Sequence, residues 1–572
     1  MDIIRLSLAQ ESFNTTICLD KEREALLSFK RGLQDPVGRL SSWTGVDCCR
    51  WRGIECSMSG NVIKLDLRNT FQSTTSRRSC FAGLTSIKYL NMGNANLDDQ
   101  RLEFLQAVNM LPFLEELHMH SCGLYNLPIS LSYVNLSLLY VLDLSDNEIQ
   151  SSIPNWIYNL TSLTKLDLSN DYYNLNGNIP RECGDKDSKE NLDPQLYYGM
   201  EGQIPGSLGI LCGLKVLNLS GNLLTGKLDE FLDSFTTVCP DNSLVSLSLS
   251  GNQLTGALPS SLGKLKYLKQ LHISHNCFSG SVPESIGNLL FLQELDISLN
   301  EMNGTIPRSL GQLSKITVLN FEDNHWQGVI TEDHIMNLTR LQYLYVSTDR
   351  ARPLVFNVTT EWNPPFRLLS LELNNCIVGP TFPAWIRVQN ELNNIVLHST
   401  GIEDTIPEEW FSNISFQVTY LDLSDNKIKG KLPQNIKFPE LTFIDLRRNR
   451  FEGLLPLGFT NATYVFLQQN LFSGPIADNI SEMTQLKFLD VSENHLTGNP
   501  LLCGKPLLSK CPGCHVDSDV PTTQSIDDDF QSELENLLFY CCGYVFGICC
   551  VWCTLWKKDA WREAYFGFLK LA

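Results

Sequence analysis

The sequence predicts an α/β solenoid, a curved right-handed superhelix of stacked coils with a parallel sheet on its concave face. Three observations predict it. A leucine-rich motif recurs along most of the 572 residues, most often at a step of 24, as at Leu247, Leu271, Leu295 and Leu319. A second motif with a proline follows in the same phase, and cysteines cluster near both ends of the array. A period in this range is typical of a repeat protein whose neighbouring coils share one core.

The leucine-rich motif predicts the sheet. Its copies include Leu247-Ser-Leu-Ser-Gly-Asn252 and Leu295-Asp-Ile-Ser-Leu-Asn300. Alternate residues of a short strand point to opposite faces, so the two apolar residues are buried and the residue between them faces outward. The Asn amide can pair with backbone groups that a buried turn otherwise leaves unpaired. The recurring asparagines are Asn147, Asn222, Asn252, Asn276, Asn300, Asn324, Asn426, Asn449, Asn470 and Asn494.

About 17 coils fit between Val62 and Gly498, and we expect the repeats to span residues 61–498, with irregular stretches near 171–205 and 348–366. Cys122 and Cys376 stand in the Asn position of their coils, so we expect them to be buried rather than to bind a ligand.

The second motif, Gly-x-Ile/Leu/Val-Pro, occurs for example at Gly256-Ala-Leu-Pro259 and Gly304-Thr-Ile-Pro307. Proline cannot donate a hydrogen bond within an inner strand, so this segment is predicted to lie on the outer side of each coil. With this motif the sequence resembles the plant-specific class of leucine-rich repeats.

The N-terminal segment 18–60 contains Asp20-Lys-Glu-Arg-Glu-Ala-Leu-Leu-Ser-Phe-Lys30, whose apolar residues recur at helical spacing. It resembles the helical, cysteine-containing N-terminal cap of plant leucine-rich-repeat proteins. The resemblance implies that Cys18 pairs with Cys48 and that Cys49 pairs with Cys56. Segment 499–514 is similar to the family's C-terminal cap, which implies a bridge between Cys503 and Cys511. Disulfides in turn imply an oxidising compartment.

The C-terminal segments predict a membrane anchor. Residues 515–536 form an acidic, flexible spacer. Residues 537–556 carry no charge over 20 positions, enough for one transmembrane helix. Lys557 and Lys558 follow, which predicts that the tail 557–572 is cytoplasmic. Gly543 and Gly547 form a small-residue motif through which this helix could pack against a partner helix.

Taken together, the chain resembles plant receptor-like proteins of the xylanase-receptor-like, disease-resistance group, which have no kinase domain. The resemblance implies a single-pass plasma-membrane protein with extracellular repeats. It also implies that the chain signals through an associated adaptor or co-receptor kinase, contacted by the membrane helix and the ectodomain. Two departures stand out. The repeats pass at Gly498 directly into the cap, so a membrane-proximal block is shortened, and residues 1–17 form only a weak or truncated signal region. Without a complete signal peptide, the repeats would stay in the cytosol and the C-terminal helix would act as a tail anchor.

Composition and motifs exclude other function classes. A formal net charge of −19 argues against nucleic acid as the main partner. Protein-kinase and hydrolase motifs are missing from the sequence, so no enzyme activity and no cofactor are predicted. The cysteines around Cys49 lack the paired spacing of a zinc site, and His118 and His120 have no further ligands nearby in the sequence.

Ten N-x-S/T sequons favour a secreted, glycosylated ectodomain. Asn218 lies inside a predicted strand, so a glycan on it would lie on the concave sheet. The acceptors are Asn14, Asn135, Asn159, Asn218, Asn303, Asn337, Asn357, Asn413, Asn461 and Asn479.

Ligand candidates are the outward positions of the concave sheet, because a solenoid usually binds there. His272, His275, Glu322, Tyr343 and Tyr345 combine aromatic and polar character on neighbouring strands. For each residue the alternative is a merely solvated sheet surface. The predicted function is a receptor for an extracellular protein or peptide, of microbial origin in plant defence. The alternatives are an inhibitor of a secreted cell-wall-degrading enzyme, a developmental peptide receptor, or a non-signalling remnant.

Overall fold

The computed structural model describes residues 18–32, 35, 38–68, 83–95, 101–125, 127–128, 130–131, 133–170, 199–455, 458–476 and 482–497. Two compact units are distinguished: Met1–Phe472 with Ala477–Asn494, and Ser473–Ile476 with His495–Ala572. In the second unit, Ser473 and Gly474 pair with His495 and Leu496. The first unit is the solenoid.

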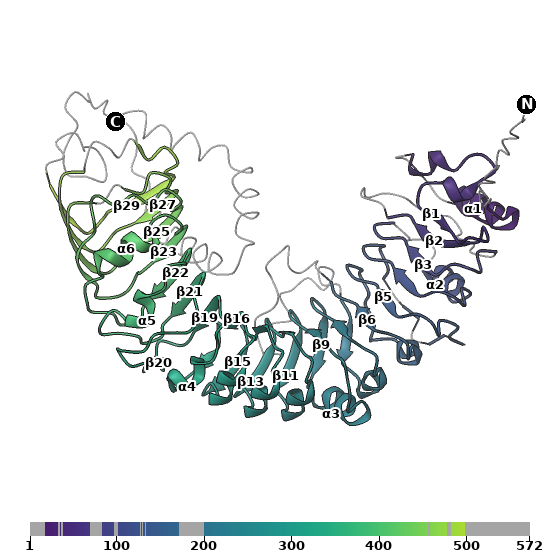
Figure 1. Ribbon diagram of the computed structural model, residues 1–572, viewed down its shortest axis with the longest axis horizontal. Helices are drawn as coiled ribbons and strands as arrows, with labels where there is room; N and C mark the ends of the chain where they lie inside the picture. The colour runs from purple at the N-terminus through teal and green to yellow at the C-terminus, as the bar shows by residue number, and fades with distance from the viewer. Residues whose placement is uncertain are drawn as a thin grey trace, which may run out of the picture. The chain divides into compact units, whose positions relative to one another are not determined.

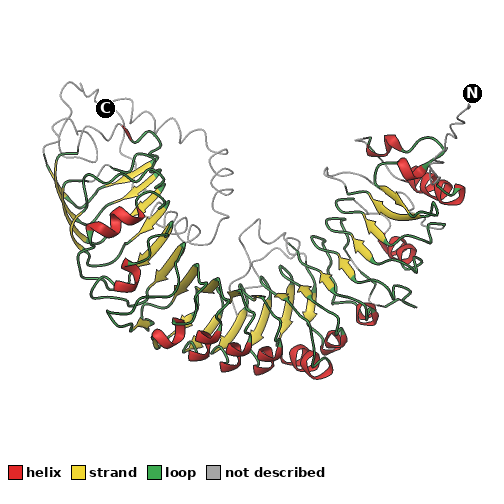
Figure 2. Ribbon diagram, viewed as in Figure 1, coloured by secondary structure: helices red, strands yellow, loops and turns green. Residues whose placement is uncertain are grey.

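Within the described residues of the first unit, the main sheet has 18 strands, all parallel except the first pair. Figure 1 shows these strands along the inner, concave side of the unit, and Figure 2 shows the helices on its outer side. The strands are β1 (Ile54–Cys56), β2 (Val62–Asp66), β3 (Tyr89–Asn91), β4 (Glu116–His118), β5 (Val141–Asp143), β6 (Lys165–Asp167), β8 (Val216–Asn218), β10 (Ser246–Ser248), β12 (Gln270–His272), β14 (Glu294–Asp296), β16 (Val318–Phe321), β19 (Tyr343–Ser347), β21 (Ser370–Asn374), β22 (Asn394–His398), β23 (Tyr420–Asp422), β25 (Phe443–Asp445), β27 (Tyr464–Phe466) and β29 (Phe488–Asp490).

A second row of shorter, parallel strands follows the turns of the coils. The sequence did not predict these strands. Most of them begin right after the ladder position, as at Asn252 before β11, and several end at a positive-φ glycine such as Gly256. These strands are β7 (Glu201–Gln203), β9 (Leu223–Gly226), β11 (Gln253–Gly256), β13 (Cys277–Gly280), β15 (Glu301–Gly304), β17 (His325–Trp326), β18 (Val329–Ile330), β20 (Val355–Phe356), β24 (Lys429–Lys431), β26 (Arg450–Gly453), β28 (Leu471–Gly474) and β30 (His495–Leu496).

Short helices lie on the outer side of many coils, and several of them follow the proline of the second motif. Pro259, Pro283 and Pro307 each stand directly before a 3-10 helix, where a missing N–H costs nothing. The helices are η1 (Arg39–Ser42), η2 (Cys48–Arg50), η3 (Asn155–Asn159), η7 (Gly206–Ile210), η8 (Ser260–Lys264), η9 (Glu284–Asn288), η10 (Arg308–Gln312), α1 (Asp20–Gly32), α2 (Arg101–Val108), α3 (Asp229–Val238), α4 (Glu332–Ile335), α5 (Ala384–Arg387) and α6 (Glu408–Ile414).

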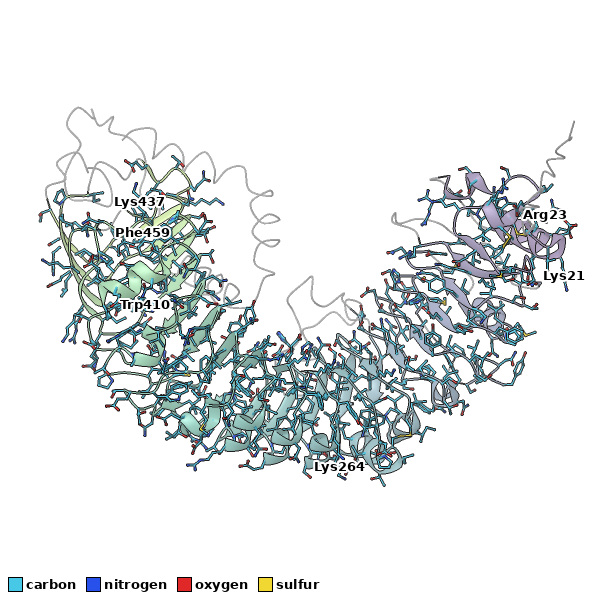
Figure 3. The ribbon with its side chains drawn as sticks, in the orientation of Figure 1. Lys21, Arg23, Lys264, Trp410, Lys437 and Phe459 are labelled. Atoms are coloured by element: carbon cyan, nitrogen blue, oxygen red, sulfur yellow. A yellow bond between two sulfur atoms is a disulfide. The ribbon has the colours of Figure 1, made fainter. Side chains whose placement is uncertain are left out.

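The core runs continuously between the sheet and these outer elements. The two apolar residues of most strand motifs, such as Leu247 and Leu249, are fully buried. In the later coils of this unit, aromatic residues form part of the core beneath the sheet. Trp410 of α6 packs on Phe382 with ring centroids 5.1 Å apart, and Phe438 packs on Phe459 at 5.6 Å (Figure 3).

The asparagine of each motif joins neighbouring coils. Asn252 Nδ2 donates to the carbonyls of Leu249 in its own coil and Leu219 in the preceding one, both at 3.0 Å. Its Oδ1 accepts from Leu224 N at 3.1 Å. Buried backbone groups that would otherwise be unpaired are thus satisfied in every coil that has the Asn.

The residue before this ladder position adopts a positive φ throughout. It is a non-glycine residue at 12 described positions, among them Asp146, His275 and Arg448. At Gly221 the space is closed as well, since a Cβ there would lie 1.8 Å from the carbonyl oxygen of Asn170. Each coil therefore turns through the same left-handed residue before its Asn enters the core.

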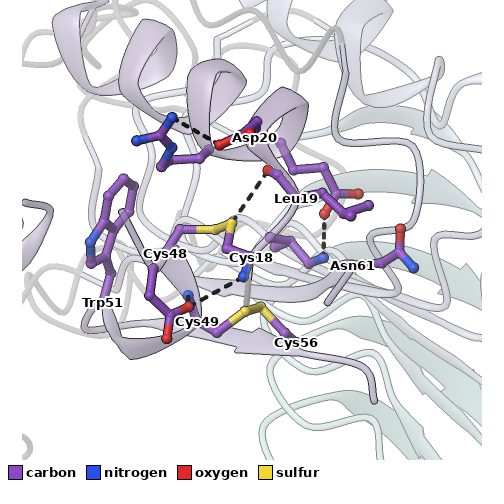
Figure 4. Close-up of a disulfide and its surroundings, with 12 residues drawn as sticks. Cys18, Leu19, Asp20, Cys48, Cys49, Trp51, Cys56 and Asn61 are labelled. Carbon is purple, nitrogen blue, oxygen red and sulfur yellow. Dashed lines mark hydrogen bonds and ion pairs between the residues drawn. A yellow bond between two sulfur atoms is a disulfide. The ribbon is translucent and has the colours of Figure 1, made fainter. Parts of the chain in front are cut away.

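The N-terminal cap closes the first coil. Leu26 and Phe29 of α1 are fully buried, Trp43 stacks on Trp51, and β1 pairs antiparallel with β2. Figure 4 shows the disulfides Cys18–Cys48 and Cys49–Cys56, the pairs that the family resemblance implies. A covered edge keeps the long sheet from pairing with other chains.

Within the described part of the chain, no helix has the length and apolar character needed to cross a membrane. The predicted anchor 537–556 with Gly543 and Gly547, the spacer, the tail, segment 1–17, and Asn14, Asn479, Cys503 and Cys511 lie outside the described residues.

Candidate functional site

The concave sheet brings residues from distant parts of the chain into straight rows. Each strand pairs with the next in one-to-one register, so the outward residue between the two buried ones lies beside its counterpart in the next coil. One such row runs Ser248, His272, Asp296, Asn320 and on to Tyr345. Two regions of this surface differ in chemistry.

The first region, called here the serine-lined region, covers β5 to β14. Small polar side chains hydrogen-bond to one another on its outward face. The hydroxyls of Ser145, Ser169 and Ser298 each donate to the Asp two residues earlier at 2.7 Å. Ser220 and Ser248 hydroxyls lie 2.6 Å apart. These groups satisfy each other and leave little apolar surface for a ligand.

At the N-terminal end of this region, His118 and Asp143 form a charged pair. His118 Nδ1 lies 3.4 Å from Asp143 Oδ2, and the hydrogen bond raises the pKa of His118 although burial opposes the shift. Burial would raise the pKa of Asp143, but hydrogen bonds from His118 and Ser145 outweigh it and bring the pKa down to about 2. His120, two residues on, lies 3.3 Å from the Asn94 amide nitrogen.

The second region, called here the mixed region, covers β16 to β29. It begins with a carboxyl pair. Glu322, directly after β16, and Glu372 of β21 lie on either side of β19 with their carboxyl groups near enough to interact, and Asn374 Nδ2 donates to Glu322 at 3.3 Å. Asn394 Nδ2 donates to Glu372 at 2.7 Å. Burial and the neighbouring carboxylates raise the pKa of Glu322 well above its ordinary value, and burial raises the pKa of Glu372 to about 7. The pair can therefore share a proton near neutral pH.

A charge network continues into β22 to β25. Asp445 is only 1% exposed, and burial with the Asp422 carboxylate raises its pKa well above the ordinary value, although Arg447 lies 3.1 Å away. His398 Nδ1 lies 2.8 Å from the Ser424 hydroxyl, and burial lowers its pKa. Arg350, from the irregular stretch 348–366, reaches His398 Nε2 at 3.2 Å. The irregular stretch thus contributes to the concave surface.

An aromatic row flanks this network. Tyr420 and Phe443 stack with ring centroids 4.2 Å apart, and Phe443 also contacts Tyr464 and Phe466. Phe488 extends the row at 4.9 Å from Phe466. Rigid aromatic side chains beside charged groups are what protein and peptide interfaces use as anchors. The sequence shows these residues, but their contact across four coils follows from the stacking.

The predicted ligand residues fall into two groups. Glu322, Tyr343 and Tyr345 belong to the mixed region, and the two tyrosine rings lie 6.4 Å apart. Tyr345 is only 5% exposed, so it offers little surface as it stands. His272 lies in the serine-lined region, with Nε2 3.0 Å from Glu294 Oε2. His275 is exposed, but it occupies the positive-φ turn position rather than the sheet.

Most sequons within the described residues lie away from the concave sheet. Asn218 lies in β8, and its Oδ1 accepts from Ser220 N at 3.2 Å. The other described acceptors are exposed: Asn135, Asn159, Asn303, Asn337, Asn357, Asn413 and Asn461.

The cysteines of the described residues have structural roles. A third disulfide joins Cys212 to Cys239 after α3, which single cysteines 27 residues apart did not reveal. Cys122 and Cys376 are buried and free, and their sulfurs face backbone carbonyls, as the motif predicts. Burial raises the pKa of Cys122 to about 12. The sulfurs of Cys18, Cys48 and Cys49 lie close enough to suit a metal, but all three are in disulfides.

Comparisons with known proteins agree with this architecture. The family model described as leucine-rich repeat region matches residues 207–403, and the leucine-rich repeat N-terminal domain matches 19–57. Receptor-like protein EIX2 of Solanum lycopersicum is 31% identical over 86% of this chain and 60% of the relative. Receptor-like protein EIX1 of the same plant is 34% identical over 74% of this chain and 54% of the relative.

The chain belongs to the leucine-rich-repeat receptor-like protein family. It spans little more than half the length of these two relatives. Among solved structures, this receptor-like protein is similar to the ectodomain of the Arabidopsis receptor kinase HAESA in complex with an IDA peptide hormone. Their TM-score is 0.64 at 26% identity, over 84% of this chain and 78% of that one. The matching family models describe repeats and their cap rather than a catalytic domain.

Proposed function

We propose that this chain is a non-enzymatic cell-surface receptor-like protein that binds an extracellular protein or peptide on the mixed region of its concave sheet. The observation that carries the proposal is the contrast along that sheet. From β16 to β29 the outward positions hold a stacked aromatic row beside partly buried charged groups. The described strands of the serine-lined region have no such aromatic row, and their partly buried Asp143 is already paired with His118.

Glycosylation favours the same half of the sheet. Asn218 is an acceptor on the outward face of β8, and a glycan there would cover part of the serine-lined region. None of the eight sequons within the described residues falls in a strand from β16 to β29. A glycan at Asn218 would therefore hinder a ligand on part of the serine-lined region, whereas the described strands of the mixed region would stay uncovered.

Ligand class and signalling extend the proposal by similarity. The peptide complex of the HAESA ectodomain shows that a related solenoid holds a peptide hormone. The relatedness to EIX1 and EIX2, together with the resemblance to the disease-resistance group, favours a microbial ligand in plant defence. Signalling would pass through an associated receptor kinase. The repeats would lie outside the plasma membrane, with residues 537–556 as the single span.

A response assay in leaf tissue tests the binding region. The full chain would be expressed and challenged separately with a secreted fungal xylanase and with a synthetic IDA peptide. We expect one of the two to trigger an early oxidative burst that Tyr464→Ala reduces at least tenfold. Ser246→Ala, at the same strand position in the serine-lined region, is the matched control and should leave the response unchanged. An equal loss in both variants, or a response to neither probe, contradicts the proposal.

The location has its own test. Treatment of the membrane-extracted chain with an endoglycosidase should increase its electrophoretic mobility by several glycans. An unchanged mobility would overturn the extracellular assignment.

A further inference from the structure

One edge of the solenoid carries a patch of exposed aromatic and basic side chains. We call leading edge the segment just before each strand of the main sheet. On the leading edge of β12 and β14, Tyr267 is 53% exposed, Leu290 54% and Phe291 40%. The Tyr267 and Phe291 rings lie 6.1 Å apart, and Lys315 Nζ lies 4.0 Å from the centroid of the Phe291 ring. These residues, with Lys266, form what we call the edge patch.

The edge patch is basic in a chain that is acidic. Lys264, Lys266 and Lys269 are exposed, and no Asp or Glu occurs between Ser261 and Val282. The whole chain has a formal net charge of −19. Exposed lysines around exposed aromatic rings can bind an acidic protein surface that also offers an apolar contact.

Sequons frame the edge patch on both sides. Asn135, Asn159 and Asn337 occupy one repeat position, six residues before the first paired residue of β5, β6 and β19. At the same position, the coils of β8, β12, β14 and β16 have Ile210, Lys264, Asn288 and Gln312, none of which starts a sequon. The leading edge is therefore free of glycan acceptors from residue 160 to residue 336.

Asn288 would become a glycan acceptor if one residue of its surroundings changed. The sequence there is Asn288-Leu289-Leu290, so the acceptor Asn is present and exposed. Only the third residue differs from a sequon, and that residue is the exposed Leu290 of the edge patch.

We propose that the edge patch is the docking site for a second protein, which presents acidic side chains around an apolar one. This surface is separate from the concave sheet, so its partner differs from the ligand. Tyr267, Leu290 and Phe291 would supply the apolar contact, and Lys266, Lys269 and Lys315 the charge complement. The role of the sequons rests on the proposed extracellular location, which the endoglycosidase experiment tests by itself.

Crosslinking in intact membranes tests the proposal. A photo-reactive phenylalanine analogue would replace Leu290 in the full chain, expressed in plant cells, and crosslinked peptides would be sequenced by mass spectrometry. We expect one adduct, joined to an acidic segment of another protein. The control position is the exposed Leu138, which is equivalent to Phe291 in the coil of β5 and lies three residues after the acceptor Asn135; it should give no adduct. No adduct at 290, equal adducts at both positions, or an adduct between two copies of this chain overturns the proposal.

Two variant sets, each carrying the analogue at Phe291, separate docking from folding. Leu290→Thr completes the sequon at Asn288 and should add one glycan and reduce the adduct at least tenfold. Asn288→Gln with Leu290→Thr has no glycan and should keep clearly more of the adduct than Leu290→Thr alone, with the remaining loss due to the missing Leu290 contact. Lys266→Glu with Lys269→Glu should also reduce it at least tenfold. Lys487→Glu, at the position equivalent to Lys269 in the coil of β29, should not. Retention of the adduct in the glycan-bearing variant contradicts docking at this edge.

Discussion

The serine-lined and mixed regions share one backbone and differ in what they present to solvent. In both, the strands pair in the same register and an Asn joins most coils to their neighbours. In the first, outward hydroxyls and carboxylates satisfy each other. In the second, partly buried acids, arginines and stacked rings occupy the same positions. The buried residues thus determine the scaffold, and the outward ones are free to determine the ligand.

The largest effect should come from what the regions share. Asn252→Ala and Asn449→Ala each leave one buried backbone N–H without its acceptor and remove one of the two Asn donors to each of two buried carbonyls. We expect each to lower the free energy of unfolding of its part of the array by roughly 3 kcal/mol, because unpaired buried groups are costly. Hydrogen exchange of the adjacent coils would measure it. Cys122→Ala, which removes only one weak donor at this position, is the control and should cost less. A large difference between the two Asn variants would break the comparison.

Opposite pH responses should separate the two regions. The folded pKa of Glu372, about 7, exceeds its ordinary value, so its contribution to stability is complete below about pH 4.5 and is lost as pH rises towards 7. Asp143, with a pKa of about 2, contributes above about pH 4, and its contribution is lost as pH falls towards 2.

Glu372→Gln should therefore flatten the stability of the mixed region between pH 4.5 and 7, by roughly 2 kcal/mol. Asp143→Asn should act only in acid, at the other end of the array. Denaturant titrations followed by hydrogen exchange at pH 3, 5 and 7 would distinguish them. The expectation fails if Glu372→Gln leaves the slope between pH 5 and 7 unchanged.

The smallest effects concern the outward side chains themselves. Phe443→Ala removes a ring stacked on Tyr420 and in contact with Tyr464, and we expect a loss of about 1.5 kcal/mol. Ser248→Ala removes one hydroxyl contact with Ser220 and should cost about 0.5 kcal/mol. Thermal unfolding of the two variants would measure the difference. Equal losses would mean that the aromatic row adds no stability of its own.

The motif spacing was sufficient for the scaffold. It predicted which residues are buried, which face outward, and that Cys122 and Cys376 lie in the core. The outward surface was harder, because exposure there depends on neighbours up to 50 residues away. Tyr345 and Asp445 occupy outward positions yet are buried by adjacent side chains. Glu322 and Glu372 meet only because β19 brings their coils together across a degenerate part of the repeat.

The position of His275 and the Cys212–Cys239 disulfide could not be predicted from the sequence motifs. His275 was expected on the sheet, but the residue before each ladder position turns through a positive φ, and a single copy of the motif does not show this. The Cys212–Cys239 bridge depends on where α3 ends relative to the previous coil. The family resemblance implied the disulfides of the N-terminal cap because the cap motif fixes their positions. The Cys212–Cys239 disulfide belongs to no such motif.

The ladder has a consequence for how such a chain can change over generations. Each Asn joins only its own coil and the one before it, so no hydrogen bond of the ladder skips a neighbour. A recombination event that adds or removes one whole 24-residue step would leave every remaining junction of the ladder intact. The same event would move the aromatic row and the charge network by one coil relative to the rest of the surface. New recognition surfaces can therefore arise from exchange of whole coils, without any substitution in the core.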